Sequence, residues 1–201
     1  MALGWGIVGI GSHPDLKVAP AMQVANGSEL VAVCGRDQGR SDAFAEAHGA
    51  KAAYTDLNDL LRDSRVDAVF VASPNSLHAP QSIQSANAGK HVLCQARMAL
   101  NLKESREMAQ AARDAGLVNA LYPPLPGLKG DRVMVRLLHQ DGFVGDIREV
   151  RVAGMALLEE VDTYAWQSDP DVTGVNTMTL GMWVEVLNRW VGQATSVYAT
   201  G

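Results

Sequence analysis

The chain has 201 residues, enough for one large domain, or for one domain and part of a second. Its hydrophobic content of 47% and charged content of 19% are typical of a chain that buries a core, which excludes an intrinsically disordered protein. The formal net charge is −5 and the charges are interspersed, so neither nucleic acid nor a membrane surface is indicated as a partner. Cys34 and Cys94 lie in no metal-binding pattern, and we predict no metal site and two reduced cysteines.

The amino-terminal segment MALGWGIVGIG has no basic region, and glycines interrupt its apolar residues, so we expect no signal peptide. No apolar run approaches the length of a membrane span. We therefore predict a cytoplasmic protein.

Strands and helices alternate through the first 122 residues, and Gly89 and Gly116 are placed to end two of the helices. Such alternation predicts βαβ units, right-handed crossovers and a doubly wound parallel sheet, so residues 1–122 are predicted to form a Rossmann domain of the α/β class. In chain order we expect a strand at 5–9, a helix at 16–24, a strand at 29–34, helices at 41–48 and 56–63, a strand at 66–72, a helix at 78–88, a strand at 91–94, a helix at 103–115 and a strand at 118–122.

The segment PPLPGLKG at 123–130 predicts a domain boundary, because prolines and glycines interrupt regular structure. Beyond it we expect a helix at 132–139, a strand at 146–153, a loop at 161–174, a helix at 178–190 and a strand at 195–199. Two strands cannot form an independent sheet, so residues 123–201 are predicted to be an incomplete α+β domain. We expect a second copy of the chain to cover the strand edge at 195–199, which gives a homo-oligomer.

A glycine loop follows the first predicted strand. Gly9 permits a tight turn, and Gly11 lets the backbone approach a diphosphate at the start of the next helix. We predict that Gly9, Gly11, Ser12 and His13 contact this group; the usual third glycine is absent, and a plain tight turn is the alternative.

The second predicted strand ends in Gly35, where NAD-binding proteins usually carry an acid for the ribose 2′-hydroxyl. A small residue leaves room for a 2′-phosphate, and Arg36 could pair with it, so NADP is favoured over NAD. In the alternative interpretation, Arg36 is a solvated loop residue and Asp37 binds the ribose.

Three further segments, VDAVFVASPNSLHA (66–79), AGKHVLCQARMALN (88–101) and DGFVGDIREVRV (141–152), together with GIVGIG resemble the Gfo/Idh/MocA oxidoreductases. That family includes glucose–fructose oxidoreductase and inositol dehydrogenase. The resemblance implies an NAD(P)-dependent enzyme that acts on a sugar, polyol or related small polar substrate. It also implies cofactor contacts from residues that follow the third and fourth strands, although the Ser-Pro-Asn turn would equally cap a helix. These residues are Ser73, Pro74, Asn75, His78 and Gln95.

The sequence departs from the family at both expected proton-handling positions. The lysine of the usual Glu-Lys-Pro is Ala96, and Arg97 occupies the proline position. The family pattern Asp-x-Gly-x-His-x-x-Asp becomes Thr179, Trp183 and Val186 at its polar positions. We expect Trp183 and Trp190 to pack in the core, Glu185 to be solvated and His139 to lie on the surface.

Two hypotheses follow from these losses. In the first, the chain is an oxidoreductase in which Arg97 holds an acidic or polar substrate and Tyr122, or water, carries the proton. Tyr122 could instead be a packing residue at the domain boundary. In the second hypothesis, the chain binds a dinucleotide without catalysis, as a sensor, regulator or assembly subunit.

Overall fold

The computed structural model describes residues 2–122, 130–153, 169–174 and 178–200. The chain divides into two units, Met1–Tyr122 with Ala165–Val175, and Pro123–Tyr164 with Asn176–Gly201. The sequence did not predict that residues 165–175 belong with the first unit.

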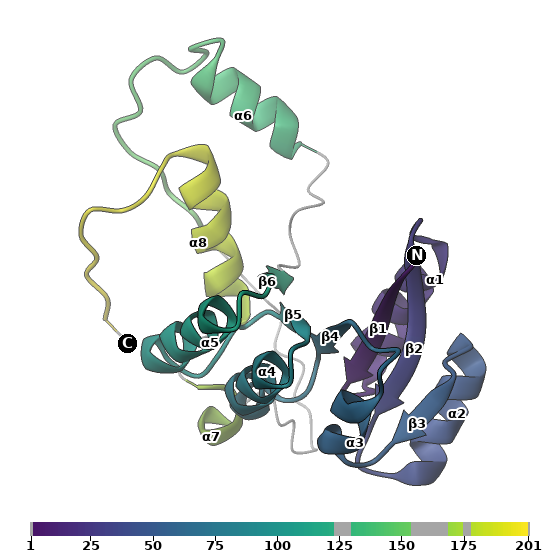
Figure 1. Ribbon diagram of the computed structural model, residues 1–201. Helices are drawn as coiled ribbons and strands as arrows, with labels where there is room; N and C mark the ends of the chain where they lie inside the picture. The colour runs from purple at the N-terminus through teal and green to yellow at the C-terminus, as the bar shows by residue number, and fades with distance from the viewer. Residues whose placement is uncertain (1, 123–129, 154–168, 175–177, 201) are drawn as a thin grey trace, which may run out of the picture. The chain divides into compact units, whose positions relative to one another are not determined.

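Six parallel strands in the order β3-β2-β1-β4-β5-β6 form the sheet in the described part of the first unit (Figure 1). The predicted doubly wound Rossmann sheet is confirmed. Because β1 and β4 are neighbours, the chain moves outward from this pair in both directions, and ligands of such sheets bind at this point. The strands are β1 (Leu3–Val8), β2 (Ser28–Cys34), β3 (Ala52–Tyr54), β4 (Ala68–Val71), β5 (His91–Gln95) and β6 (Asn119–Tyr122).

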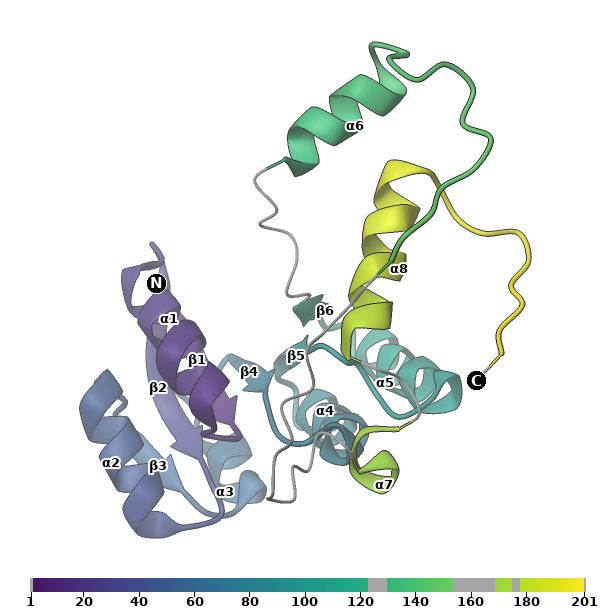
Figure 2. The same ribbon diagram turned by 180° about the vertical axis from the view of Figure 1, so that it is seen from behind.

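Helices cover both faces of this sheet, as Figure 1 and Figure 2 show from opposite sides. One face packs against α3 (Leu57–Arg62), α4 (His78–Asn87) and α5 (Leu102–Asp114), with Leu60, Ala86 and Met108 in its core. The other face packs against α1 (Ala19–Val24) and α2 (Gln38–His48), with Val18, Phe44 and Phe70 in its core. Burial on both faces explains the continuous apolar runs in the sequence.

The strand register brings the carboxyl ends of the strands to one edge. Val8 at the end of β1 is aligned with Cys34 on β2 and with Val71 on β4, and Gln95 on β5 is aligned with Tyr122 on β6. The loops that carry the predicted site residues therefore leave the sheet at one edge.

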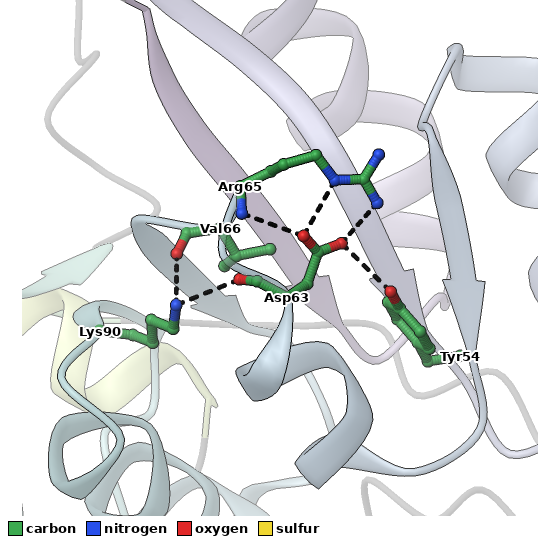
Figure 3. Close-up of polar contacts among 5 residues, drawn as sticks. All are labelled: Tyr54, Asp63, Arg65, Val66 and Lys90. Atoms are coloured by element: carbon green, nitrogen blue, oxygen red, sulfur yellow. Dashed lines mark hydrogen bonds and ion pairs between the residues drawn. The ribbon is translucent and has the colours of Figure 1, made fainter.

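A polar cluster, which the sequence did not predict, links Tyr54 at the end of β3 to Asp63 and Arg65, which precede β4 (Figure 3). Arg65 donates from Nε and Nη2 to the two carboxylate oxygens of Asp63, over 2.9 and 2.6 Å, and Tyr54 donates its hydroxyl over 3.1 Å. Lys90 donates its ammonium group to the backbone oxygens of Asp63 and Val66. The arginine holds the pKa of Asp63 down at about 2.

The second unit contains α6 (Asp131–His139) and α8 (Met178–Trp190), whereas α7 (Pro170–Thr173) belongs to the first unit. Arg189 and Trp190 on α8 both donate to the carboxylate of Asp131 at the start of α6. Trp190 is thus a partly buried hydrogen-bonding residue, and its predicted packing in the core stays a prediction, while Glu185 and His139 are exposed as expected.

The two strands predicted in the second unit are wrong. Residues 146–153 and 195–199 form neither a strand nor a bridge, and no backbone ladder pairs them with other described residues. Alternating apolar residues are suited to a strand, but a strand also needs a neighbour to accept and donate its backbone hydrogen bonds. Of the predicted loop at 161–174, residues 161–168 lie outside the described residues, and α7 occupies part of the remainder.

Candidate functional site

A cavity of about 370 Å³ opens at the carboxyl edge of the sheet, around the loops that follow β1, β2, β3 and β4. Of the predicted cofactor residues, six line it and the other five do not. The six are Gly9, Gly11, Arg36, Asp37, Ser73 and Pro74.

The glycine loop meets the steric demands of this position. A Cβ atom on Gly9 would lie 2.6 Å from the backbone nitrogen of Ser73, and the φ angle of Gly9 is +91°, so no other residue fits without strain. A Cβ atom on Gly11 would have no atom within 4 Å, and Gly11 is among the residues that line the cavity. The backbone from Gly9 to Gly11 therefore has no side chain at either glycine that would keep a ligand away from it.

A helical segment begins directly after this loop. The amide of Asp15 donates to the oxygen of Gly11, and the π-helix η1 (Pro14–Val18) continues into α1. The first turn of a helix leaves N–H groups without acceptors inside the helix, and the helix dipole favours an anion there. Ser12 is exposed at this end of the helix, so the arrangement suits a phosphate group.

In the loop after β4, the polar residues Ser73 and Asn75 are buried, and one of their polar atoms has no hydrogen-bond partner among the described residues. Ser73 donates its hydroxyl to Oε1 of Gln81 over 2.6 Å. Asn75 is 4% exposed, and its Nδ2 finds no hydrogen-bond partner in the described part of the chain. An amide donor buried without a partner next to a cavity is an available contact for a polar ligand.

His78 contacts the backbone of that loop and does not line the cavity. Its Nδ1 is 2.6 Å from the backbone oxygen of Arg97, and its Nε2 is 2.7 Å from the backbone oxygen of Ser73. The ring is 1% exposed; burial lowers its pKa, and the two carbonyl groups oppose this shift. His78 therefore connects the loops after β4 and β5, so its predicted cofactor contact stays a prediction.

Further unsatisfied polar atoms belong to residues that do not line the cavity, two of them at or just after the end of β5 and one directly before η1. Oε1 of Gln95, Nε of Arg97 and Nε2 of His13 are buried without partners among the described residues. Burial lowers the pKa of the Arg97 guanidinium, although such a group stays charged in a protein. These three atoms could bind the polar groups of a ligand that continues past the cavity.

Tyr122 contacts His13 across this edge, with ring centroids 5.8 Å apart, and packs edge-on against Phe70 at 5.9 Å. Burial, followed by the charge of Lys17, lowers the pKa of His13, so the imidazole is neutral at neutral pH. Tyr122 is the last residue of β6, and His13 lies between the end of β1 and η1. Both strands end at the same edge of the sheet, and this shared edge is the signal that could have paired the two residues.

Ala96 and Val186 stand where the family has a lysine and an aspartate. The amide of Ala96 donates to the oxygen of Tyr122 over 3.1 Å, which leaves a methyl group at this position. Val186 is 6% exposed, and Trp183 is partly buried on the same helix. The side chain of Thr179 lies outside the described residues.

Two other classes of site are absent from the described residues. No group of three or more histidine, cysteine, aspartate or glutamate side chains is placed to hold a metal ion. No described helix has both the length and the apolar character needed to cross a membrane.

Comparison with known proteins agrees with this geometry. The oxidoreductase family with an NAD-binding Rossmann fold matches residues 3–122. The chain is 43% identical over 116 residues to the scyllo-inositol 2-dehydrogenase (NADP(+)) of Bacillus subtilis, which covers 58% of this chain and 35% of that protein. It is 38% identical over 114 residues to the 1,5-anhydro-D-fructose reductase of Ensifer adhaerens, which covers 57% of this chain and 34% of that protein.

Among solved structures, a 3-ketoreductase from Actinomadura kijaniata, in complex with NADP and TDP-benzene, superposes with a TM-score of 0.84. The two chains are 23% identical, and the match covers 96% of this chain and 58% of the other, so the likeness shows the fold. Matches to the two curated relatives span about a third of their lengths. The match over residues 3–122, together with the glycine-loop cavity at the β1–β4 junction, shows that this chain belongs to the Gfo/Idh/MocA oxidoreductase family, with its NAD-binding Rossmann fold.

Proposed function

We propose that the chain is the cofactor-binding part of an NAD(P)-dependent oxidoreductase that acts on a small polar substrate such as a sugar or polyol. The observation that carries this proposal is the open space in front of Gly11 in a cavity at the β1–β4 junction. The names of the relatives, an inositol dehydrogenase and an anhydrofructose reductase, support the substrate class.

In this proposal the amide groups from Gly11 to His13 bind the diphosphate of the dinucleotide. The side-chain amide of Asn75 supplies a donor to the middle of the ligand, and its present lack of a partner fits that role. The cofactor, when bound, would accept the hydride. Side chains of the protein would bind the substrate and accept its proton.

Oxidation of an alcohol also releases the hydroxyl proton, which a positioned group must accept. Because Ala96 offers no such group, we propose that the hydroxyl of Tyr122 accepts the substrate's proton as it releases its own to water or to the neutral ring of His13, which lies beside it. The charged guanidinium of Arg97 would bind an anionic or polar group of the substrate.

Substitution of Gly11 by valine tests the proposal. No atom lies within 4 Å of the Cβ position, so the first side-chain carbon meets no protein atom, and the valine side chain would cover the backbone that we propose to bind the diphosphate. We expect isothermal titration calorimetry to show binding of NADPH or NADH to the wild type and loss of binding in Gly11→Val. Gly130→Ala, which also introduces a Cβ into open space, is the control.

Turnover assays with sugars, polyols and their oxidised forms complete the test. A substrate-dependent change in NADPH absorbance is the expected result. If neither dinucleotide binds to the wild type, the proposal is wrong. If a dinucleotide binds but no substrate is turned over, the enzymatic part of the proposal is wrong.

A further inference from the structure

An acidic side chain follows the glycine loop closely, and a histidine from another helix binds it. Asp15 lies in the first turn of η1, and its Oδ1 is 2.7 Å from Nε2 of His48 at the carboxyl end of α2. We propose that His48 is a positioning residue for the cofactor: it holds the carboxylate of Asp15 and so leaves the amide groups of the glycine loop free for the diphosphate. This inference rests on the proposed function, because it concerns the same ligand.

Asp15 is the first acid after the glycine loop, and its position makes it a competitor of the diphosphate. Its amide donates to the oxygen of Gly11 over 3.2 Å, so the two residues are one helical turn apart. The helical conformation continues from η1 into α1, because Val18 and Ala19 both have right-handed helical backbone angles. The positive end of a helix attracts an acid in its first turn as it attracts a ligand anion, and such an acid can reach back to the N–H groups there.

The contact with His48 determines where this carboxylate lies. The Asp15 side chain is 50% exposed, so packing does little to fix it. Among the residues that the structure describes, its carboxylate accepts a hydrogen bond from the imidazole and from no backbone amide. An ionised carboxylate only accepts hydrogen bonds, so Nε2 of His48 carries the hydrogen that binds it. The carboxylate is therefore held by α2 instead of the loop.

His48 itself is fixed through both its ring and its backbone. Its side chain is 11% exposed, and its ring packs against Phe44, one turn earlier on α2, with ring centroids 4.5 Å apart. Its backbone oxygen accepts a hydrogen bond of 2.7 Å from Nε2 of Gln23 on α1. The helices α1 and α2 lie on the same face of the sheet, and Phe44 belongs to the core on that face (Figure 2). The imidazole is thus a rigid anchor for Asp15.

Dissociation constants for NADPH, measured by titration of nicotinamide fluorescence, test the proposal. His48→Phe keeps an aromatic ring against Phe44 and removes the N–H donor. We expect it to weaken NADPH binding by about tenfold, because the released carboxylate competes for the charge-assisted hydrogen bonds of the loop amides. Asp15→Ala removes the competitor and should bind NADPH at least as tightly as the wild type. Lys51→Ala, which breaks an exposed ion pair with Glu29 shortly after α2, is the matched control and should leave the constant unchanged.

The double variant of His48→Phe with Asp15→Ala separates a positioning role from a structural one. If His48 acts through Asp15, the double variant should regain the NADPH affinity of Asp15→Ala to within about twofold. If His48 only supports the fold, the double variant should bind as weakly as His48→Phe, and the inference is wrong. His48→Leu, which also lacks the donor, replaces His48→Phe in both variants if circular dichroism shows that the phenylalanine variant is unfolded.

Inorganic pyrophosphate, used as a competitor of NADPH, locates the effect. Its inhibition constant should rise in His48→Phe by about the same factor as the dissociation constant of NADPH, because the proposed competition concerns the anion site alone. If either constant is unchanged in His48→Phe, or if Asp15→Ala weakens NADPH binding, the inference is wrong while the proposed function stands. If the wild type binds neither NADPH nor NADH, the proposed function itself fails.

Discussion

His78 and Arg97 are joined through the backbone: Nδ1 of the histidine lies 2.6 Å from the carbonyl oxygen of the arginine. The same ring reaches Ser73 on its other side, 2.7 Å away, so one buried side chain sets the spacing between two loops of the candidate site. A neutral imidazole has one N–H, and it can donate to only one of these two carbonyl groups.

Replacement of His78 by alanine should therefore destabilise the protein by about 2–4 kcal/mol, because it leaves a cavity and removes the hydrogen-bond donor of a buried carbonyl group. Urea unfolding measured by circular dichroism gives this value directly. His139→Ala, at an exposed position, is the control and should cost little. A loss below about 1 kcal/mol in His78→Ala would contradict the assigned role.

The pH dependence of stability should reveal the same histidine. Burial lowers the pKa of His78 in the folded state, so folding favours the neutral ring. The contribution is fully present above the unfolded pKa of about 6.5 and is lost as the pH falls from there toward the lower folded value. We expect the unfolding free energy of the wild type to fall between about pH 7 and pH 5, and to fall less in His78→Asn. Equal slopes would exclude His78 as a cause.

Asp63 should contribute stability in a more acidic range. Its pKa is held down at about 2, first by the Arg65 side chain, compared with 3.8 in an unperturbed group. Its contribution is present above pH 3.8 and is lost as the pH falls toward 2, so Asp63→Asn should cost about 2 kcal/mol at pH 7 and much less at pH 2.5. Asp59→Asn, which removes an exposed ion pair, should cost less than about 1 kcal/mol. Urea unfolding at both pH values decides between these outcomes.

Tyr122→Phe tests the proposed proton carrier. The variant keeps the aromatic contacts with His13 and Phe70 and removes the hydroxyl group. We expect kcat to fall by about 10²-fold or more, with the dissociation constant for NADPH unchanged. Tyr198→Phe, at a side chain that is 90% exposed, is the matched control. Retention of full kcat in Tyr122→Phe would assign the proton to water or to another group.

Arg97→Gln tests the predicted interaction with acidic substrates. Nε of Arg97 is buried without a partner in the described residues, so an anionic substrate should gain more from it than a neutral polyol. We expect the KM for a sugar acid to rise by about 10²-fold and the KM for the neutral polyol to rise by less than about threefold. Arg106→Gln, at an exposed position on α5, is the control. Equal effects on both substrates would show that Arg97 does not select for charge.

The segment at 195–199 bears on oligomerisation. It is not a strand, but Val197 is 84% and Tyr198 90% exposed, and exposed apolar residues in extended segments favour association. We expect light scattering to show a dimer or larger species, and a double substitution of both residues by aspartate to shift it toward the monomer. A monomeric wild type would contradict this prediction.

Strand and helix patterns of the first unit were readable from the sequence because each element is buried against the sheet on a regular period. The short strand β3 was missed, since three half-buried residues carry too little periodic signal. The strands predicted at 146–153 and 195–199 were wrong for the opposite reason: the pattern was present, but pairing depends on neighbours that no local pattern reveals.

The candidate site was predictable in part. The Gly-x-Gly turn and the end of β2 follow from local spacing, and they did indicate residues that line the cavity. The role of His78 between two loops, and the contact of His13 with Tyr122, depend on segments far apart in the chain, brought together by the strand register. Asp37 caps α2 by accepting a hydrogen bond from the amide of Arg40, and this role was hidden because the same acid could equally bind a ribose.

All the residues that line the cavity lie between Val8 and Gln81, within the first four βα units of the chain. If this cavity binds the dinucleotide as proposed, its recognition is encoded in one continuous stretch of the gene. The residues after this stretch can change during evolution, and the reaction can change with them, while the residues that bind the coenzyme stay the same. The two lost proton-handling positions lie outside this stretch, where such divergence costs the coenzyme site nothing.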